Sequence, residues 1–342
     1  MSKSLKNKKG GDYMNGHVIK IVDVLDFVER PKKEAADPKE VIRTSIFEKR
    51  RFPYLYLFPA MWIVIAYVLA KKAFCKLFFG SKPKINSIFF DGLGPWSKKV
   101  KDGAASWKAL DIIYNHPFKR TYTLGNLVDE FWWFSQNCQA VRNRFKLVKQ
   151  EVKKAILHFG KDNEEVRLVS LACGSAQAII ETVSELKAQG INARVLLIDI
   201  EQEALDYAKG LAIKNNIAGQ FDFVKANAYQ TAKILRRFKP HIVEMLGLLD
   251  YLPRENAIRL IFTIRRSLVP GGIFLTCNIR QNSEQHFVRW VIDWDMVYRS
   301  PASLAEVIEK SGFDAYRIVY EPLKIHGVVI AEKSEVKSYV RA

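Results

Sequence analysis

The second half of the chain alternates between short apolar segments and amphipathic segments, and this alternation constrains the fold more than any other feature. Strands are expected at 166–172, 194–199, 221–225, 241–246, 272–277, 316–320 and 326–331. Helices are expected near 176–189, 202–214, 229–237, 254–267 and 302–311. Such alternation gives right-handed crossovers and a parallel sheet with helices on both faces. The predicted fold class is therefore α/β, with a doubly wound, mostly parallel, seven-stranded sheet.

The last two expected strands are separated by only a few residues around Pro322. A parallel pair needs a crossover of a dozen or more residues, whereas an antiparallel pair can be joined by a short turn. The C-terminal strands should therefore form an antiparallel hairpin at one edge of the sheet.

The part of the chain before the sheet is expected to form a helical extension. Residues 1–53 form a basic tail with short helical pieces such as VIKIVDVLDFVE, and 81–125 form a connector or lid with one helix. A long helix over 126–159 opens the main domain, 126–342, because its apolar residues recur every three or four positions.

Residues 54–80 are the hydrophobic segment of this extension, and they begin with the uncharged run YLYLFPAMWIVIAYVLA. A membrane-spanning helix needs about 20 apolar residues, so the run is short for a span. It also fits an in-plane or re-entrant anchor with Tyr, Trp and Lys at the lipid headgroups, or a buried core helix. The flanking pairs Arg50-Arg51 and Lys71-Lys72 favour membrane association.

The net charge of +18 is concentrated at the front of the chain. Residues 1–125 carry 24 Lys and Arg against 11 Asp and Glu, which leaves +13 in this part. Such a surplus points to an anionic partner, either a membrane surface or a nucleic acid. The four cysteines are far apart and show no metal-ligand spacing, so reduced thiols, no disulfides and no metal site are expected.

Three expected strand ends carry residues that suit a nucleoside. The turn ACGSAQ (172–177) is built of small residues, Asp199 ends the second strand, and Asn227 follows the third. Small residues let a ligand approach the backbone, a carboxylate can accept both ribose hydroxyls, and an amide can pair with the edge of an adenine. The glycine pattern that cradles a pyrophosphate in dinucleotide enzymes is missing.

The chain from about 126 to 332 resembles the class I S-adenosylmethionine-dependent methyltransferases, which have a Rossmann-like fold. The segments that carry the resemblance are SLACGSA, LIDIEQEALDYAK and SLVPGGIFLTCNIR. WWFSQNCQAVRNR, EMLGLLDYL, WDMVYRSP and IHGVVIAEK resemble a sparsely characterised bacterial branch of these enzymes. The resemblance implies S-adenosyl-L-methionine as the cofactor.

The resemblance also assigns cofactor contacts by position. Cys173, Gly174 and Ser175 would line the methionine part, and Asp199 would bind the ribose. Ile200, Asn227 and Ala228 would hold the adenine, with Leu246 and Gly247 beneath the sulfonium. Arg144 or Arg142 would pair with the methionine carboxylate.

The chain departs from the family pattern at three positions. Ser170 replaces the usual acidic residue of the first strand, and this removes an expected contact to the methionine ammonium. Ala172 and Ala176 replace two glycines of the turn. Close approach by the cofactor survives with alanine if the backbone φ stays negative there.

Methyl transfer depends mainly on alignment, so a general base is optional. The candidates are Asp250 and Tyr251, directly after the fourth strand, and His326, at the start of the last.

The leading hypothesis is a methyltransferase that is peripheral or single-pass on the cytoplasmic side of a membrane. It would methylate oxygen or nitrogen of a small-molecule or lipid-like acceptor. Nucleic acid is a disfavoured partner, because GLLDYL stands where base-amino methyltransferases carry Asp/Asn-Pro-Pro-aromatic. The alternatives are an RNA methyltransferase with a basic N-terminal arm and a non-catalytic scaffold at the membrane.

Overall fold

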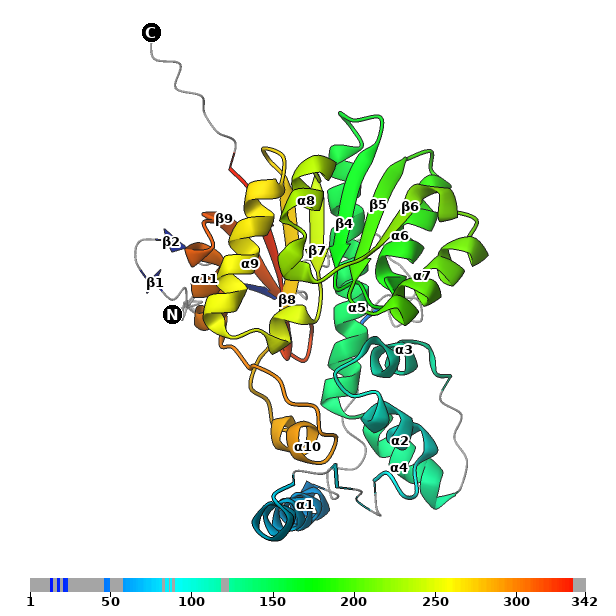
Figure 1. Ribbon diagram of the computed structural model, residues 1–342, viewed down its shortest axis with the longest axis vertical. Helices are drawn as coiled ribbons and strands as arrows, with labels where there is room; N and C mark the ends of the chain where they lie inside the picture. The colour runs from blue at the N-terminus through cyan, green and yellow to red at the C-terminus, as the bar shows by residue number, and fades with distance from the viewer. Residues whose placement is uncertain are drawn as a thin grey trace, which may run out of the picture.

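The computed structural model describes residues 13–14, 17–18, 21–23, 46–49, 58–81, 84–85, 87, 90–117 and 123–334. Its centre is a twisted sheet with helices on both faces (Figure 1). The strands are β4 (Val166–Leu171), β5 (Ala193–Asp199), β6 (Phe221–Lys225), β7 (Ile242–Met245), β8 (Ile273–Ile279), β9 (Ala315–Tyr320) and β10 (His326–Glu332).

The strand order is β9-β10-β8-β7-β4-β5-β6. β10 is antiparallel to both β8 and β9, and the other neighbouring pairs among these strands are parallel. The chain thus forms the seven-stranded, doubly wound sheet with an antiparallel C-terminal hairpin that the sequence predicts.

Two apolar layers cover the sheet. One contains α5 (Gln136–Phe159), α6 (Gln177–Lys187) and α7 (Gln202–Lys214). The other contains α8 (Ala232–Phe238), α9 (Arg254–Ser267) and α11 (Pro301–Lys310). The expected boundaries of these helices and strands agree with the structure to within a few residues. The reason is that the apolar patterns of the helices and of the strands are both strong in this part of the chain.

The prediction of one long helix over 126–159 is wrong, because the chain forms two helices there. α4 (Leu124–Trp133) ends at Phe134, and Ser135 starts α5 by accepting a hydrogen bond from the backbone N–H of Cys138 at 3.3 Å. A serine in this position satisfies a free N–H group of the new helix, so the chain can change direction there. The connector also holds α2 (Pro95–Asp102) beside α3 (Trp107–Asn115).

An extra strand from the N-terminal region extends the sheet. β3 (Ile21–Asp23) runs parallel to β9, and β1 (Tyr13–Met14) pairs with β2 (His17–Val18). The expected helical piece VIKIVDVLDFVE is therefore wrong where the structure describes it. Its β-branched residues favour extended backbone, and the open edge of β9 supplies hydrogen-bond partners.

The hydrophobic segment forms α1 (Phe58–Phe79), which lies below the sheet and packs against α10 (Gln285–Trp290) (Figure 1). Met61, Ile65 and Val68 are buried in that contact, while the remaining turns expose many large apolar side chains. Among the described residues, no helix is both long and apolar enough to cross a membrane. The expected domain boundaries stay a prediction.

Candidate functional site

The carboxyl ends of β4, β5 and β7 border a cavity of about 270 Å³. Its floor includes the turn 172–177, residues 199–201, and residues 246–248, 250 and 251. Side chains from α3, α5 and the segment 288–296 form the other walls, and many of these are apolar. The cavity therefore lies where a doubly wound sheet binds its ligand.

The turn after β4 has three residues in the left-handed region: Ala172 with φ 50°, Gly174 with φ 53° and Ala176 with φ 47°. The negative φ that close approach with alanine was expected to require is therefore absent at both positions. The turn keeps the backbone of a glycine-rich loop at the positions where the resembled family has its glycines. For each alanine this left-handed conformation has a free-energy cost of about 1–2 kcal/mol.

Gly174 is needed for a second reason. A Cβ atom added there would lie 2.9 Å from Cβ of Trp107, at the start of α3. The Trp107 ring packs against Tyr207 of α7 at 4.8 Å, and the Tyr207 hydroxyl donates to Asp111 of α3 at 2.8 Å. α3 is therefore held over the turn as a cover, and a side chain at 174 would push it away.

Asp199 lies at the cavity wall, as predicted. Its two carboxylate oxygens accept the backbone N–H groups of Gly174 at 2.8 Å and of Glu201 at 2.9 Å. An ionised carboxylate has about four acceptor sites, so each oxygen can still accept a ligand hydroxyl. The exposed Ile200 lies beside it at the rim.

Asn227 and Ala228 are not among the residues that line the cavity. The Asn227 side chain accepts from the N–H of Tyr229 at 3.0 Å and caps the short 3₁₀ turn 228–230. Their contact with an adenine stays a prediction. The other predicted cofactor residues all line the cavity: Arg144, Cys173, Gly174, Ser175, Asp199, Ile200, Leu246 and Gly247.

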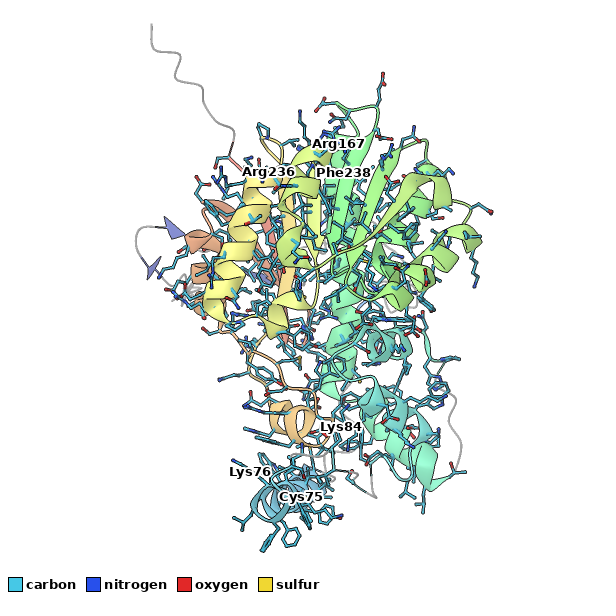
Figure 2. The ribbon with its side chains drawn as sticks, viewed as in Figure 1. Cys75, Lys76, Lys84, Arg167, Arg236 and Phe238 are labelled. Carbon is cyan, nitrogen blue, oxygen red and sulfur yellow. The ribbon has the colours of Figure 1, made fainter. Side chains whose placement is uncertain are left out.

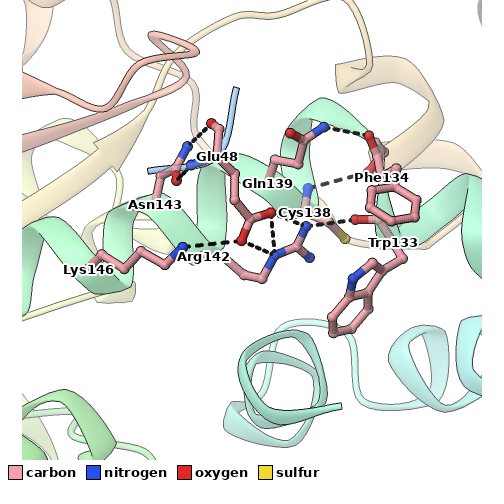
Figure 3. A network of polar contacts seen from close by, with 9 residues as sticks. Glu48, Trp133, Phe134, Cys138, Gln139, Arg142, Asn143 and Lys146 are labelled. Carbon is pink, nitrogen blue, oxygen red and sulfur yellow. Dashed lines mark hydrogen bonds and ion pairs between the residues drawn. The ribbon is translucent and has the colours of Figure 1, made fainter. Parts of the chain in front are cut away.

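The two arginines of α5 have different environments. Arg144 is buried and lines the cavity, and its guanidinium donates to the Tyr114 hydroxyl at 3.0 Å. Arg142 instead forms an ion pair with Glu48 at 2.7 Å and donates to the Trp133 carbonyl (Figure 3). Arg142 thus holds residues 46–49 against α5, and Arg144 remains as the cation of the cavity.

Asp250 and Tyr251 line the cavity, but both side chains have partners within the protein. Asp250 Oδ1 accepts the backbone N–H of Ile279 at 2.8 Å, and Oδ2 lies 3.9 Å from Arg144. The Tyr251 hydroxyl accepts from the indole N–H of Trp294 at 2.5 Å. These contacts favour positioning over proton transfer for both residues.

Among the described residues, the side chain of His326 has no hydrogen-bond partner, unlike those of Asp250 and Tyr251. It is buried at the cavity wall, and neither ring nitrogen has a hydrogen-bond partner within the described part of the chain. Burial, followed by the positive charge of Arg144, lowers the pKa of His326 well below its usual value. The imidazole is therefore neutral at physiological pH and keeps a lone pair available to a ligand.

The lining residues that the sequence analysis did not name include Trp107, Tyr114 and Glu244. Glu244 is 3% exposed in the middle of β7, and its carboxylate accepts from the Ser170 hydroxyl. An acid inside the apolar stretch HIVEML was the available signal, because a buried charge needs a specific partner. Trp107 and Tyr114 gave no signal beyond their helical spacing.

A family model described as "Putative methyltransferase" matches residues 84–333, well over half of the chain. The chain belongs to this methyltransferase family. No curated protein matches the sequence.

Solved structures share the architecture at low sequence identity. A possible exported protein from Bordetella parapertussis is 16% identical, with 80% of this chain and 97% of that chain covered, at a TM-score of 0.58. Magnesium protoporphyrin IX methyltransferase from Synechocystis PCC 6803 is 13% identical, with 66% and 92% covered, at 0.48. At 16% identity, the similarity to the first of these structures concerns the fold alone.

The sequence resemblance implies S-adenosyl-L-methionine as the cofactor of this methyltransferase. The chemistry of the cavity fits it. Asp199 offers free lone pairs to vicinal hydroxyls, the turn 172–176 offers backbone with small side chains, and Arg144 offers a buried cation for a carboxylate. The cofactor supplies, when bound, a methyl group already activated on a sulfonium.

Proposed function

We propose that this methyltransferase transfers a methyl group to a hydroxyl or carboxyl oxygen of an apolar, lipid-like acceptor at an anionic membrane surface. The observation that carries the proposal is a single apolar cluster that joins α1 to the cavity. Met61, Ile65 and Val68 of α1 share this cluster with Val288 and Trp294. Both Val288 and Trp294 also line the cavity.

The apolar wall supports an acceptor with hydrocarbon character. Leu110, Ile113, Val141, Val288 and Met296 line the cavity with apolar side chains. Apolar surfaces of this kind bind ligands by excluding water. A strongly polar acceptor would gain little from them.

The polar groups of the cavity favour oxygen over nitrogen as the methylated atom. The cation Arg144 lowers the pKa of His326 and is 3.9 Å from Asp250. A buried cation stabilises a developing oxyanion and disfavours an ammonium group. The neutral His326 can accept the proton of an acceptor hydroxyl through its free nitrogen.

α1 supports attachment to a membrane surface. Ile63, Leu77, Phe78 and Phe79 are more than 60% exposed. The cations Lys71, Lys76 and Lys84 are exposed on or just after this helix, and Figure 2 labels Lys76 and Lys84 at this end of the molecule. Exposed apolar groups flanked by lysines match the headgroup region of an anionic bilayer.

Vesicle flotation tests the attachment. The full-length protein should float with vesicles that contain phosphatidylglycerol, and less with pure phosphatidylcholine. The triple variant Leu77→Ser, Phe78→Ser, Phe79→Ser should lose flotation. Ile213→Ser on α7 and Phe262→Ser on α9 are matched controls, because both side chains are exposed on helices of the sheet layers. Flotation that survives the triple variant would overturn the role of α1.

An acceptor screen tests the reaction. Methyl-labelled S-adenosylmethionine is incubated with the protein and either a total lipid extract or total RNA. Label should enter the lipid fraction, as an alkali-labile ester or an alkali-stable ether. Label in RNA alone would favour the RNA methyltransferase alternative. Absence of both transfer and cofactor binding would favour the non-catalytic scaffold.

A further inference from the structure

We infer that Glu244 is the carboxylate that binds the primary ammonium group of the cofactor, from the strand next to the one where the acid is missing. Ser170 holds this carboxylate in place. The inference rests on the proposed function, since the ammonium group belongs to the amino-acid part of S-adenosylmethionine.

The strand register brings Ser170 and Glu244 together. Ser170 on β4 pairs directly with Glu244 on the neighbouring parallel strand β7. Paired residues on adjacent strands point to the same face, and the strands lie about 4.8 Å apart. Glu244 therefore places an acid on the strand next to Ser170, at the same position along the strand direction. The longer glutamate side chain, rather than an aspartate, extends its reach back toward the cavity.

The surroundings of Glu244 suit a cationic ligand. The flanking residues in the same row are Leu197 on β5 and Leu275 on β8. The Ser170 hydroxyl and the backbone N–H of Leu246 donate to the carboxylate. No ion pair joins Glu244 to any residue in the described ranges, although it is almost fully buried. A buried carboxylate without a counter-ion, in the wall of a cavity, suits a cationic ligand.

The two other buried acids of the cavity have different assignments: Asp199 is assigned to the ribose hydroxyls, and Asp250 pairs with Arg144. Asp199 accepts two backbone N–H groups, and Asp250 lies 3.9 Å from the Arg144 guanidinium. Glu244 thus remains as the acid for a ligand cation. The titratable groups that interact electrostatically with Glu244 are Arg144 of α5, Cys173 in the turn after β4 and Cys277 of β8.

Calorimetry with two ligands tests the inference. S-adenosylhomocysteine carries the ammonium group, and its deamino analogue has hydrogen in place of it. Glu244→Gln should weaken the binding of S-adenosylhomocysteine by about 10- to 100-fold, which is the range expected for a lost charge-assisted hydrogen bond. The same substitution should change binding of the deamino analogue by less than about threefold. Glu151→Gln is the matched control, a buried glutamate of α5 that pairs with Lys154 and Arg317 outside the cavity.

Two further measurements separate a binding role from a structural one. The double variant Ser170→Asp, Glu244→Gln restores an acid on β4 and should recover most of the affinity for S-adenosylhomocysteine. At pH 7 the wild type should release protons on binding this ligand, because the ammonium favours the ionised carboxylate. Glu244→Gln should abolish this release.

The outcomes distinguish this inference from the proposed function. Equal losses for both ligands, or unchanged binding of both by Glu244→Gln, would overturn the role of Glu244. A wild-type protein that binds neither ligand would overturn the cofactor assignment itself. If Glu244→Gln alone folds poorly, the double variant still tests the inference through its recovery of affinity for S-adenosylhomocysteine.

Discussion

The Ser170 hydroxyl donates to the Glu244 carboxylate across neighbouring parallel strands, at the floor of the cavity. This pair gives the cavity a buried acid although the first strand of the sheet has none. The carboxylate therefore lies on β7, and Ser170 of β4 donates a hydrogen bond to it. The stability of the fold should depend on the charge of this carboxylate.

Glu244 should make the cofactor-free protein less stable as the pH rises. Burial raises the pKa of Glu244 to about 7, while hydrogen bonds from Ser170 and Leu246 oppose the rise. The folded state therefore holds a proton that the unfolded chain has lost, between about pH 4.5 and pH 7. The cost above pH 7 is on the order of 3 kcal/mol.

Urea unfolding between pH 5 and pH 8 checks this dependence. Glu244→Gln should be more stable than the wild type at pH 8, and the advantage should shrink toward pH 5. A stability difference that stays constant over this range would contradict the assignment.

Gly174→Ala should destabilise the fold by at least about 2 kcal/mol, since it combines left-handed backbone with a 2.9 Å approach to Trp107. Binding of S-adenosylhomocysteine should be lost with it. Gly210→Ala on α7 is the control, because nothing lies within 4 Å of an added Cβ there. The control should gain up to about 1 kcal/mol. Similar unfolding midpoints for both variants would contradict the packing of α3 on the turn.

Ala176→Gly should stabilise the protein by about 0.5–1 kcal/mol, because glycine adopts φ 47° without the penalty that alanine bears. Ala178→Gly, inside α6, should do the opposite and cost about 1 kcal/mol. Thermal unfolding of both variants measures the contrast. A loss of stability in Ala176→Gly would argue against the left-handed conformation at this position.

His326→Leu should lower methyl transfer into a lipid extract by about 100-fold without destabilising the fold. The reason is that both ring nitrogens are buried without a partner in the part of the chain that the structure describes, so their removal costs no hydrogen bond there. Transfer and urea unfolding are measured on the same preparation. Unchanged transfer would remove His326 from the reaction, and a strong loss of stability would reveal a structural role.

The sequence predicts the sheet well because its strands are apolar and its crossovers are regular. Asp199 was found because it ends a strand, and strand ends can be read locally. Glu244 was missed because its importance depends on the pairing of β4 with β7, two strands separated by more than 60 residues. The positive φ of Ala172 and Ala176 could not be predicted from the sequence, because alanine rarely adopts a positive φ. The break at Ser135 was missed because the apolar periodicity continues across it.

Binding of S-adenosylhomocysteine to the wild type and to Asp199→Asn tests the central claim most directly. Calorimetry should show one site in the wild type and binding at least about tenfold weaker in Asp199→Asn, which loses half of its acceptor capacity toward ribose hydroxyls. Asp222→Asn, a surface acid of β6 paired with Arg194, should bind like the wild type. Equal affinity in Asp199→Asn, or no binding to the wild type, would contradict a cofactor site at the ends of β4 and β5.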